Sequence, residues 1–466
     1  MINKISLAFA LRVIIYTSAA YLFLITTLNL NLDIILLTTI YIFISLFLLE
    51  KILSYIYIVQ ISLIVIILFC FGFFVQLGLI IYDPYIFGFS GFTSLGNFNF
   101  EFNQFLEIYL VTVVSTSGIL VGIYLATRNN INKLYLARIN YKDKQKVKKK
   151  YIPIIIIFWF VLIILSNYVI DYLGLGRHGL ENKTQYPKFV VGLLLYLKGF
   201  FLSGMSYCLY DLLVKNPTKF QNKLYFFSFI FVTIFVAFEY SLSKSNIVYK
   251  FFPFLMLLIY YKDGISFKKY VPTLNLKFII YSVIFLICLI LLISYLEQKR
   301  AFLYSGTIQE INYLSLLDFF KILAVRIEGA RDVFLVTDYQ NKGLEAYINV
   351  NIGKFSPADE LYGFSLEGTK FGLTVGFQGL SYLSGSYFVT FLHSLIFILF
   401  LCKIEIFFKL RGFFVFSLFI TITLVLLAWM NIDLYTIFRY LFITFLISLS
   451  CSILKKLFWI NSSRKS

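Results

Sequence analysis

Long apolar runs, each bounded by charged or turn-forming residues, recur along almost the whole chain. A run of about 17 or more such residues is long enough to cross a bilayer as a helix. The run at 247–261 is short, whereas the run at 52–82 is long enough to tilt or kink. We therefore predict an all-α polytopic membrane protein with about twelve transmembrane helices, ten or eleven being the alternatives. The predicted helices cover residues 6–28, 32–49, 52–82, 105–127, 151–171, 189–214, 223–242, 247–261, 275–296, 376–402, 412–430 and 434–454.

Composition and the spacing of the runs divide the chain into three parts. Hydrophobic residues make up 60% of the chain and charged residues only 14%, whereas soluble domains are about a quarter charged. A large soluble domain is therefore excluded. Residues 1–296 contain nine predicted helices with short loops, 297–375 form one large loop, and 376–466 contain three helices and a tail. The first run continues to Leu28, so we interpret it as a membrane helix and not as a cleaved signal peptide.

The positive charge is concentrated in alternate loops. The chain has 41 Lys and Arg against 23 Asp and Glu, a net charge of +18, and segment 128–150 alone has nine basic residues and one acidic one. Because Lys and Arg gather on the cytoplasmic side, this pattern predicts cytoplasmic termini and no nucleic-acid partner. Residues 142–150 could bind a cytoplasmic partner, although a stop-transfer cluster attracted to anionic lipid is the favoured interpretation. The predicted outer loops are 83–104, 172–188 and 297–375.

The large outer loop is too long to be a simple connector. Its segment 308–337 has apolar residues at helical spacing, which predicts one or two amphipathic helices that lie on the membrane surface and cap a cavity. The following segment, 338–379, is rich in Gly and contains several acidic residues, which predicts a folded, irregular loop.

Arginine side chains in the outer loops are the first candidates for chemistry. The planar fork of arginine suits phosphate and pyrophosphate oxygens. Arg326 and Arg331 therefore indicate a lipid-linked phosphate as ligand, but they could instead pair with Glu328 and Asp332 and tie the loop together. These two interpretations remain open. Further donors that suit a phosphate or a sugar are Arg300, Arg177 and His178.

Carboxylates and one intramembrane lysine complete the candidates. A loop carboxylate such as Glu360 could act as general base on a sugar hydroxyl, although most single acids are turn formers or surface charges. Lys198 lies about ten residues into a predicted helix and has either a functional role or a structural one, by snorkelling or ion pairing. His393 lies in an apolar helix, which favours a packed, hydrogen-bonded histidine. The sequence shows no catalytic triad, metal-ligand cluster or P-loop, and its five cysteines indicate neither a disulfide framework nor a zinc site.

The whole-chain pattern resembles the Wzy-type bacterial repeat-unit polymerases of O-antigen and capsular polysaccharide, which are GT-C-like integral membrane glycosyltransferases. The resemblance rests on about twelve helices, cytoplasmic termini, and arginines in the third and fifth outer loops. The segment 368–387, GTKFGLTVGFQGLSYLSGSY, is also similar to the glycine-rich entry into that family's next helix, and it contains Tyr382. The family's spacing of an Arg, ten residues and a Gly is not met, because Gly343 follows Arg331 after eleven residues.

The resemblance implies a bacterial inner-membrane enzyme that joins undecaprenyl-pyrophosphate-linked oligosaccharide repeat units at the outer leaflet. No cofactor and no obligatory metal would be needed, and membrane lipid and a chain-length regulator protein are the further partners implied. Fixed cations would stabilise the departing pyrophosphate, and a carboxylate would accept the proton of the acceptor hydroxyl. The implied catalytic residues are Arg326, Arg331, Glu328, Asp332 and Glu360, and the implied substrate-binding residues are Arg177, His178, Arg300, Lys198 and Tyr382.

Two alternative functions use similar architecture. An O-antigen ligase has the same helix plan and a large outer loop, but the ligase family is expected to have a histidine in that loop, and residues 297–375 contain none. A flippase or other transporter of lipid-linked sugars would explain the helices and Lys198. It would not explain so long an outer loop, so we favour the polymerase.

Overall fold

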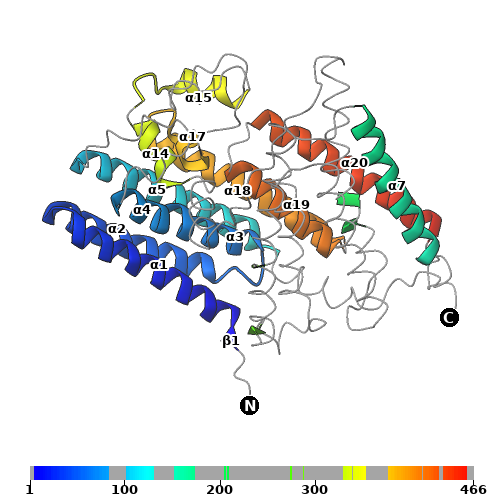
Figure 1. The fold of residues 1–466 in the computed structure, drawn as a ribbon, viewed down its shortest axis with the longest axis horizontal. Coiled ribbons are helices and arrows are strands. Elements are labelled where there is room, and N and C mark those ends of the chain that lie inside the picture. Colours follow the sequence, from blue (N-terminus) through cyan, green and yellow to red (C-terminus); the bar gives the residue numbers. More distant parts are fainter. Residues whose placement is uncertain are drawn as a thin grey trace, which may run out of the picture.

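The computed structural model describes twelve stretches of the chain, and they are almost entirely helical (Figure 1). The one short ladder among them pairs β1 (Ile5–Ser6) antiparallel with β2 (Thr273–Leu274). The described residues are 5–82, 101–130, 152–173, 204–205, 207–208, 273–274, 287, 329–337, 339–352, 376–411, 413–429 and 434–458.

Five helical segments of this part of the chain are long and apolar enough to cross a membrane. Their length and hydropathy indicate a membrane protein. They are α1 (Leu7–Asn29), α2 (Leu32–Leu53), the continuous segment Ile61–Tyr82, α5 (Phe102–Thr127) and α18 (Tyr387–Leu410). Further helices at predicted positions are α7 (Ile152–Tyr172), α19 (Phe414–Trp429) and α20 (Leu434–Phe458). The predicted helices at 189–214, 223–242, 247–261 and 275–296 lie outside the described residues, apart from a few positions.

The predicted helix 52–82 is wrong at its start. Helix α2 continues to Leu53, a turn follows, and the next helix begins only at Ile61. The turn residues Ile56 and Val59 are apolar and buried, so hydropathy could not distinguish the turn from a helix. The second helix itself consists of α3 (Ile61–Phe69), a π-helical turn η1 (Cys70–Val75) and α4 (Gln76–Tyr82).

The predicted helix 376–402 is also two helices. Helix α17 (Phe377–Tyr382) ends in a turn, and α18 begins at Tyr387. Gly385 adopts a φ of +70°, which a residue with a side chain rarely adopts, and Ser386 then caps α18 by accepting a hydrogen bond from the Val389 N–H. The chain can therefore reverse its course just before the long helix.

The large loop is more helical and more buried than expected. Helix α14 (Ala330–Thr337) does not lie on a surface, because nearly all of its side chains are buried, including Val333 and Phe334. The expectation of a surface amphipathic helix is therefore wrong for these residues. The irregular loop expected for 338–379 is interrupted by α15 (Leu344–Asn351) and contains the start of α17.

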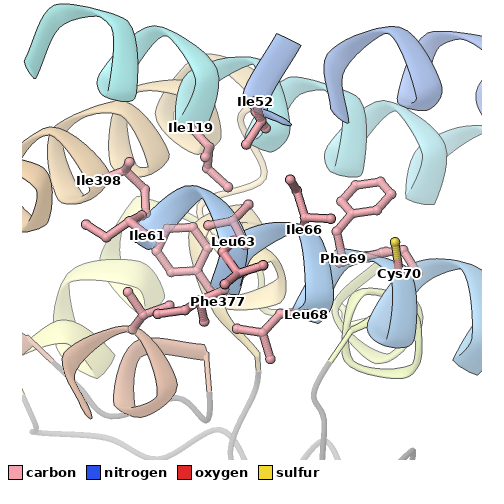
Figure 2. Packing of buried hydrophobic residues seen from close by; sticks show 14 of the residues in the cluster. Ile52, Ile61, Leu63, Ile66, Leu68, Phe69, Cys70, Ile119, Phe377 and Ile398 are labelled. Carbon is pink, nitrogen blue, oxygen red and sulfur yellow. The ribbon is translucent and has the colours of Figure 1, made fainter. Parts of the chain in front are cut away.

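The core of the described bundle gathers around α3, whose side chains are all apolar except that of Ser62. Figure 2 shows the α3 residues Ile61, Leu63 and Ile66 among side chains from α2, α5, α17 and α18. A helix that is hydrophobic all round is one surrounded by other helices. This explains why α3 lies inside the bundle while α1 and α2 keep many apolar side chains exposed.

Helices α5 and α18 pack closely through small residues. A Cβ atom on Gly118 would lie 2.5 Å from the Phe391 carbonyl oxygen, and one on Gly122 would lie 2.8 Å from that of Leu395. This GxxxG spacing lets two helix backbones approach each other inside a membrane. The hydroxyls of Ser115 and Ser394 hydrogen-bond across the same contact at 2.8 Å.

Candidate functional site

The described parts of the large loop pack onto one end of the bundle, which we call the loop end. Helices α14, α15 and α17 lie there, beside α4, α5 and α18 (Figure 1). Gly343 ties the segment before α15 to the turn after α17, because its N–H donates to the Leu383 carbonyl at 2.8 Å. Residues far apart in sequence therefore meet at this end.

A buried ion pair begins α14. The Arg331 guanidinium donates from Nε and Nη2 to Asp332 Oδ1, at 3.0 and 2.8 Å, and the two side chains are 2% and 0% exposed. Asp332 Oδ2 accepts the backbone N–H of Gly329 at 2.9 Å, so the same carboxylate caps the helix. Both carboxylate oxygens are thus engaged. Of the two interpretations left open by the sequence, the pairing of Arg331 with Asp332 is observed.

Helix α14 is anchored on the π-helical turn η1 and on the first residue of α4. The backbone N–H of Arg331 donates to Gln76 Oε1 at 3.1 Å, and Gln76 is itself buried. A Cβ atom on Gly329 would lie 2.2 Å from the carbonyl oxygen of Gly72, which belongs to η1. Single π-helical turns inside α-helices are frequent at functional sites. Here the turn provides the surface on which the loop backbone rests.

A second charged cluster joins α5, the segment before α15, and α17. Lys342 Nζ donates to Glu107 Oε1 at 3.0 Å and to the Thr337 carbonyl at 2.7 Å. The Tyr382 hydroxyl donates a short hydrogen bond to the same Glu107 oxygen, and Lys342 Nζ lies 5.4 Å from the centre of the Tyr382 ring. Burial and the hydrogen bond to Glu107 raise the pKa of Tyr382, so it remains a proton donor at neutral pH.

The third polar group of the loop end involves a histidine. The Tyr347 hydroxyl and Nδ1 of His393 share a hydrogen bond of 2.7 Å, and burial raises the pKa of Tyr347. His393 also contacts the ring of Phe377. The prediction of a packed, hydrogen-bonded histidine is confirmed. The buried amide of Gln378, next to Phe377, has no hydrogen-bond partner among the described residues.

The opposite end of α18 carries a buried ion pair of another kind. Glu405 accepts hydrogen bonds from the backbone N–H groups of Gln60 and Ile61, at 2.7 and 3.3 Å, and from Lys409. Lys409 also donates to the Ile58 carbonyl at 3.0 Å. A carboxylate at the N-terminus of α3 interacts favourably with the helix dipole. This pair fixes the turn between α2 and α3, and we assign it a structural role.

The structure brings three of the predicted site residues, Arg331, Asp332 and Tyr382, to the loop end. Sequence reasoning missed Glu107 and Lys342, although an acidic residue at the start of a predicted membrane helix is a signal that could have revealed Glu107. The other predicted site residues lie outside the described part of the chain: Arg326, Glu328, Glu360, Arg177, His178, Arg300 and Lys198.

Among the described residues, no three His, Cys, Asp or Glu side chains lie close enough to hold a metal ion, and Cys70 and Cys402 are free thiols. Comparison of the chain with protein-family models, curated proteins and solved structures gives no match. Function must therefore be argued from the sequence pattern and from the loop end itself.

Proposed function

We propose that this protein is a polysaccharide polymerase that joins undecaprenyl-pyrophosphate-linked oligosaccharide repeat units into O-antigen or capsule at the outer leaflet of the bacterial cytoplasmic membrane. The observation that carries the proposal is the loop end. There a loop segment with a buried Arg331–Asp332 pair and a second cluster, Glu107, Lys342 and Tyr382, lies at the end of apolar helices of membrane length.

The chemistry of the proposed reaction needs both kinds of charge. The leaving group is a lipid pyrophosphate, whose growing negative charge needs fixed cations, and arginine binds such oxygens with matching geometry. The acceptor is a sugar hydroxyl, whose proton needs a base. The predicted Arg326, Arg300 and Arg177 are the proposed phosphate ligands. Arg331 is buried against Asp332, and we propose that its fixed charge stabilises the departing pyrophosphate without direct contact. The proposed base is a carboxylate of the same end.

The proposed topology places the loop end on the outer side of the membrane. The apolar runs predict about twelve helices and the basic loops predict cytoplasmic termini. The inner-membrane location is what the resemblance to the polymerases implies. Under this topology the buried pair of Glu405 and Lys409 lies on the cytoplasmic side. The polar clusters of the loop end then lie at the leaflet where lipid-linked repeat units are to be joined.

A ligase and a lipid-linked oligosaccharide flippase are the alternatives. The large loop favours an enzyme over a transporter, because α14 packs on the bundle through a glycine-to-glycine backbone contact between Gly329 and Gly72. A transport route has to open and close, whereas this segment is fixed between helices. The loop end is thus better suited to hold two substrates than to let one pass.

The test is a gel of surface glycan from cells that lack the gene, together with analysis of lipid-linked intermediates in separated membrane leaflets. Single repeat units that accumulate at the outer leaflet are the result expected of a polymerase. Repeat units trapped at the inner leaflet would indicate a flippase, and long polymer left unattached would indicate a ligase. Either of the latter results would overturn the proposal. Re-expression of the full-length chain should restore the polymer.

A further inference from the structure

We propose that Glu107 is the general base of the reaction. Its Oε2 atom would accept the proton of the acceptor sugar hydroxyl. This inference rests on the proposed polymerase function and goes beyond the residues that the sequence suggested. In the proposed step the acceptor oxygen forms a bond to the anomeric carbon of the donor sugar, and its proton passes to Glu107. The bond from that carbon to the lipid pyrophosphate breaks, and its electron pair leaves with the pyrophosphate.

The two oxygens of Glu107 are held differently. Oε1 accepts hydrogen bonds from both Lys342 and Tyr382, which fix the orientation of the carboxylate. Oε2 has no hydrogen-bond partner among the described residues, and the side chain is 26% exposed. A base must be held in place by one set of contacts while an open atom reaches the substrate. Glu107 meets both conditions.

The sequence-derived candidate Asp332 does not meet them. Its Oδ1 is bound by Arg331, its Oδ2 by the Gly329 N–H, and the side chain is fully buried. An acceptor hydroxyl that approached Asp332 would have to break the ion pair and the helix cap. We therefore assign Asp332 to the positioning of Arg331, and the base to Glu107.

Helix α14 links the base to the arginine. Lys342 binds Glu107 and also the carbonyl of Thr337, the last residue of α14, while Arg331 lies in its first turn. Thr337 is six positions after Arg331, which corresponds to about 9 Å along a helix axis. One short helix thus fixes the spacing between a cation for the leaving group and a base for the acceptor. Lys342 and Tyr382 are positioning residues in this scheme.

The experiment uses full-length protein in lipid nanodiscs and the lipid-linked repeat units extracted from the gene-deletion strain. We expect Glu107→Gln to lower the polymerisation rate by about 100-fold or more, because the amide can still accept from Lys342 and Tyr382 but cannot take a proton. The matched control is Glu101→Gln, an exposed residue six positions earlier whose side chain makes no cap hydrogen bond. Its rate should equal that of the wild type.

Chemical rescue separates a base from a structural residue. Lys342 and Tyr382 hold the Glu107 carboxylate at one oxygen, so a carboxylate supplied from solution can occupy the space that Glu107→Ala leaves. In Glu107→Ala, added formate should raise the rate about tenfold or more over chloride of equal ionic strength.

The outcomes distinguish this inference from the proposed function. If the wild type forms polymer and Glu107→Gln does so at a rate within about threefold of it, Glu107 is not the base. The proposed polymerase function would stand in that case. A slow Glu107→Ala variant that formate does not rescue would also overturn the assignment of Glu107 as the base. If the wild type forms no polymer from these substrates, the proposed function fails, and the inference fails with it.

Discussion

The carboxylate of Glu405 on α18 lies 2.7 Å from the backbone N–H of Gln60 and accepts its hydrogen bond, although 345 residues separate the two in sequence. This contact, together with Lys409, holds the turn that divides α2 from α3. The helix break that hydropathy could not reveal is thus stabilised by a charged residue from another helix.

We expect Glu405→Ala to destabilise the protein by about 3–5 kcal/mol, because it removes the carboxylate partner of a buried lysine and uncaps α3. The measurement is thermal unfolding of the purified protein in detergent. Glu50→Ala is the control, since Glu50 pairs with Arg12 at an exposed position, where about 0–1 kcal/mol is typical. Equal effects of the two substitutions would contradict a structural role for Glu405.

Gly329→Ala should abolish polymer formation and lower the unfolding temperature, because its Cβ would clash with the Gly72 backbone and lift α14 from the bundle. Gly343→Ala is the matched control. A Cβ there meets nothing within 4 Å, and the extended φ of 174° suits any residue. Glycan gels and membrane protein levels check both variants. Full-length glycan from Gly329→Ala would show that the close backbone contact is dispensable.

The double variant Arg331→Met with Asp332→Asn separates structure from function at the buried pair. Replacing both charges removes the need for pairing, while Asn can still accept the Gly329 N–H, so stability should change by less than about 1–2 kcal/mol. Polymer should nevertheless be lost, because no fixed guanidinium remains for the pyrophosphate. Normal polymer from this variant would assign Arg331 a purely structural role.

Tyr347→Phe should cost about 1–3 kcal/mol of stability, because it leaves a buried nitrogen of His393 without its hydrogen-bond partner. A double-mutant cycle with His393→Phe tests this directly. The effect of Tyr347→Phe should nearly vanish in the His393→Phe background, as judged by thermal unfolding. Additive effects would mean that the two side chains do not stabilise each other.

The sequence by itself determined that most of the described part of the chain forms long apolar helices, and it located most of their ends. Inside a bilayer every backbone N–H and C=O must be satisfied within the segment, so a long apolar run leaves the helix as the only solution. It also singled out Arg331 and Asp332, from their types and their place in a long loop, and Tyr382 through the family resemblance of segment 368–387.

Only the tertiary structure decided which residues meet. Hydropathy shows that a side chain avoids water but not which helix covers it, so the inward packing of α14 and the break before α3 were invisible in the sequence. The cluster of Glu107, Lys342 and Tyr382 joins three segments separated by long stretches of chain. Such contacts depend on the relative positions of helices, which no local pattern of residues specifies.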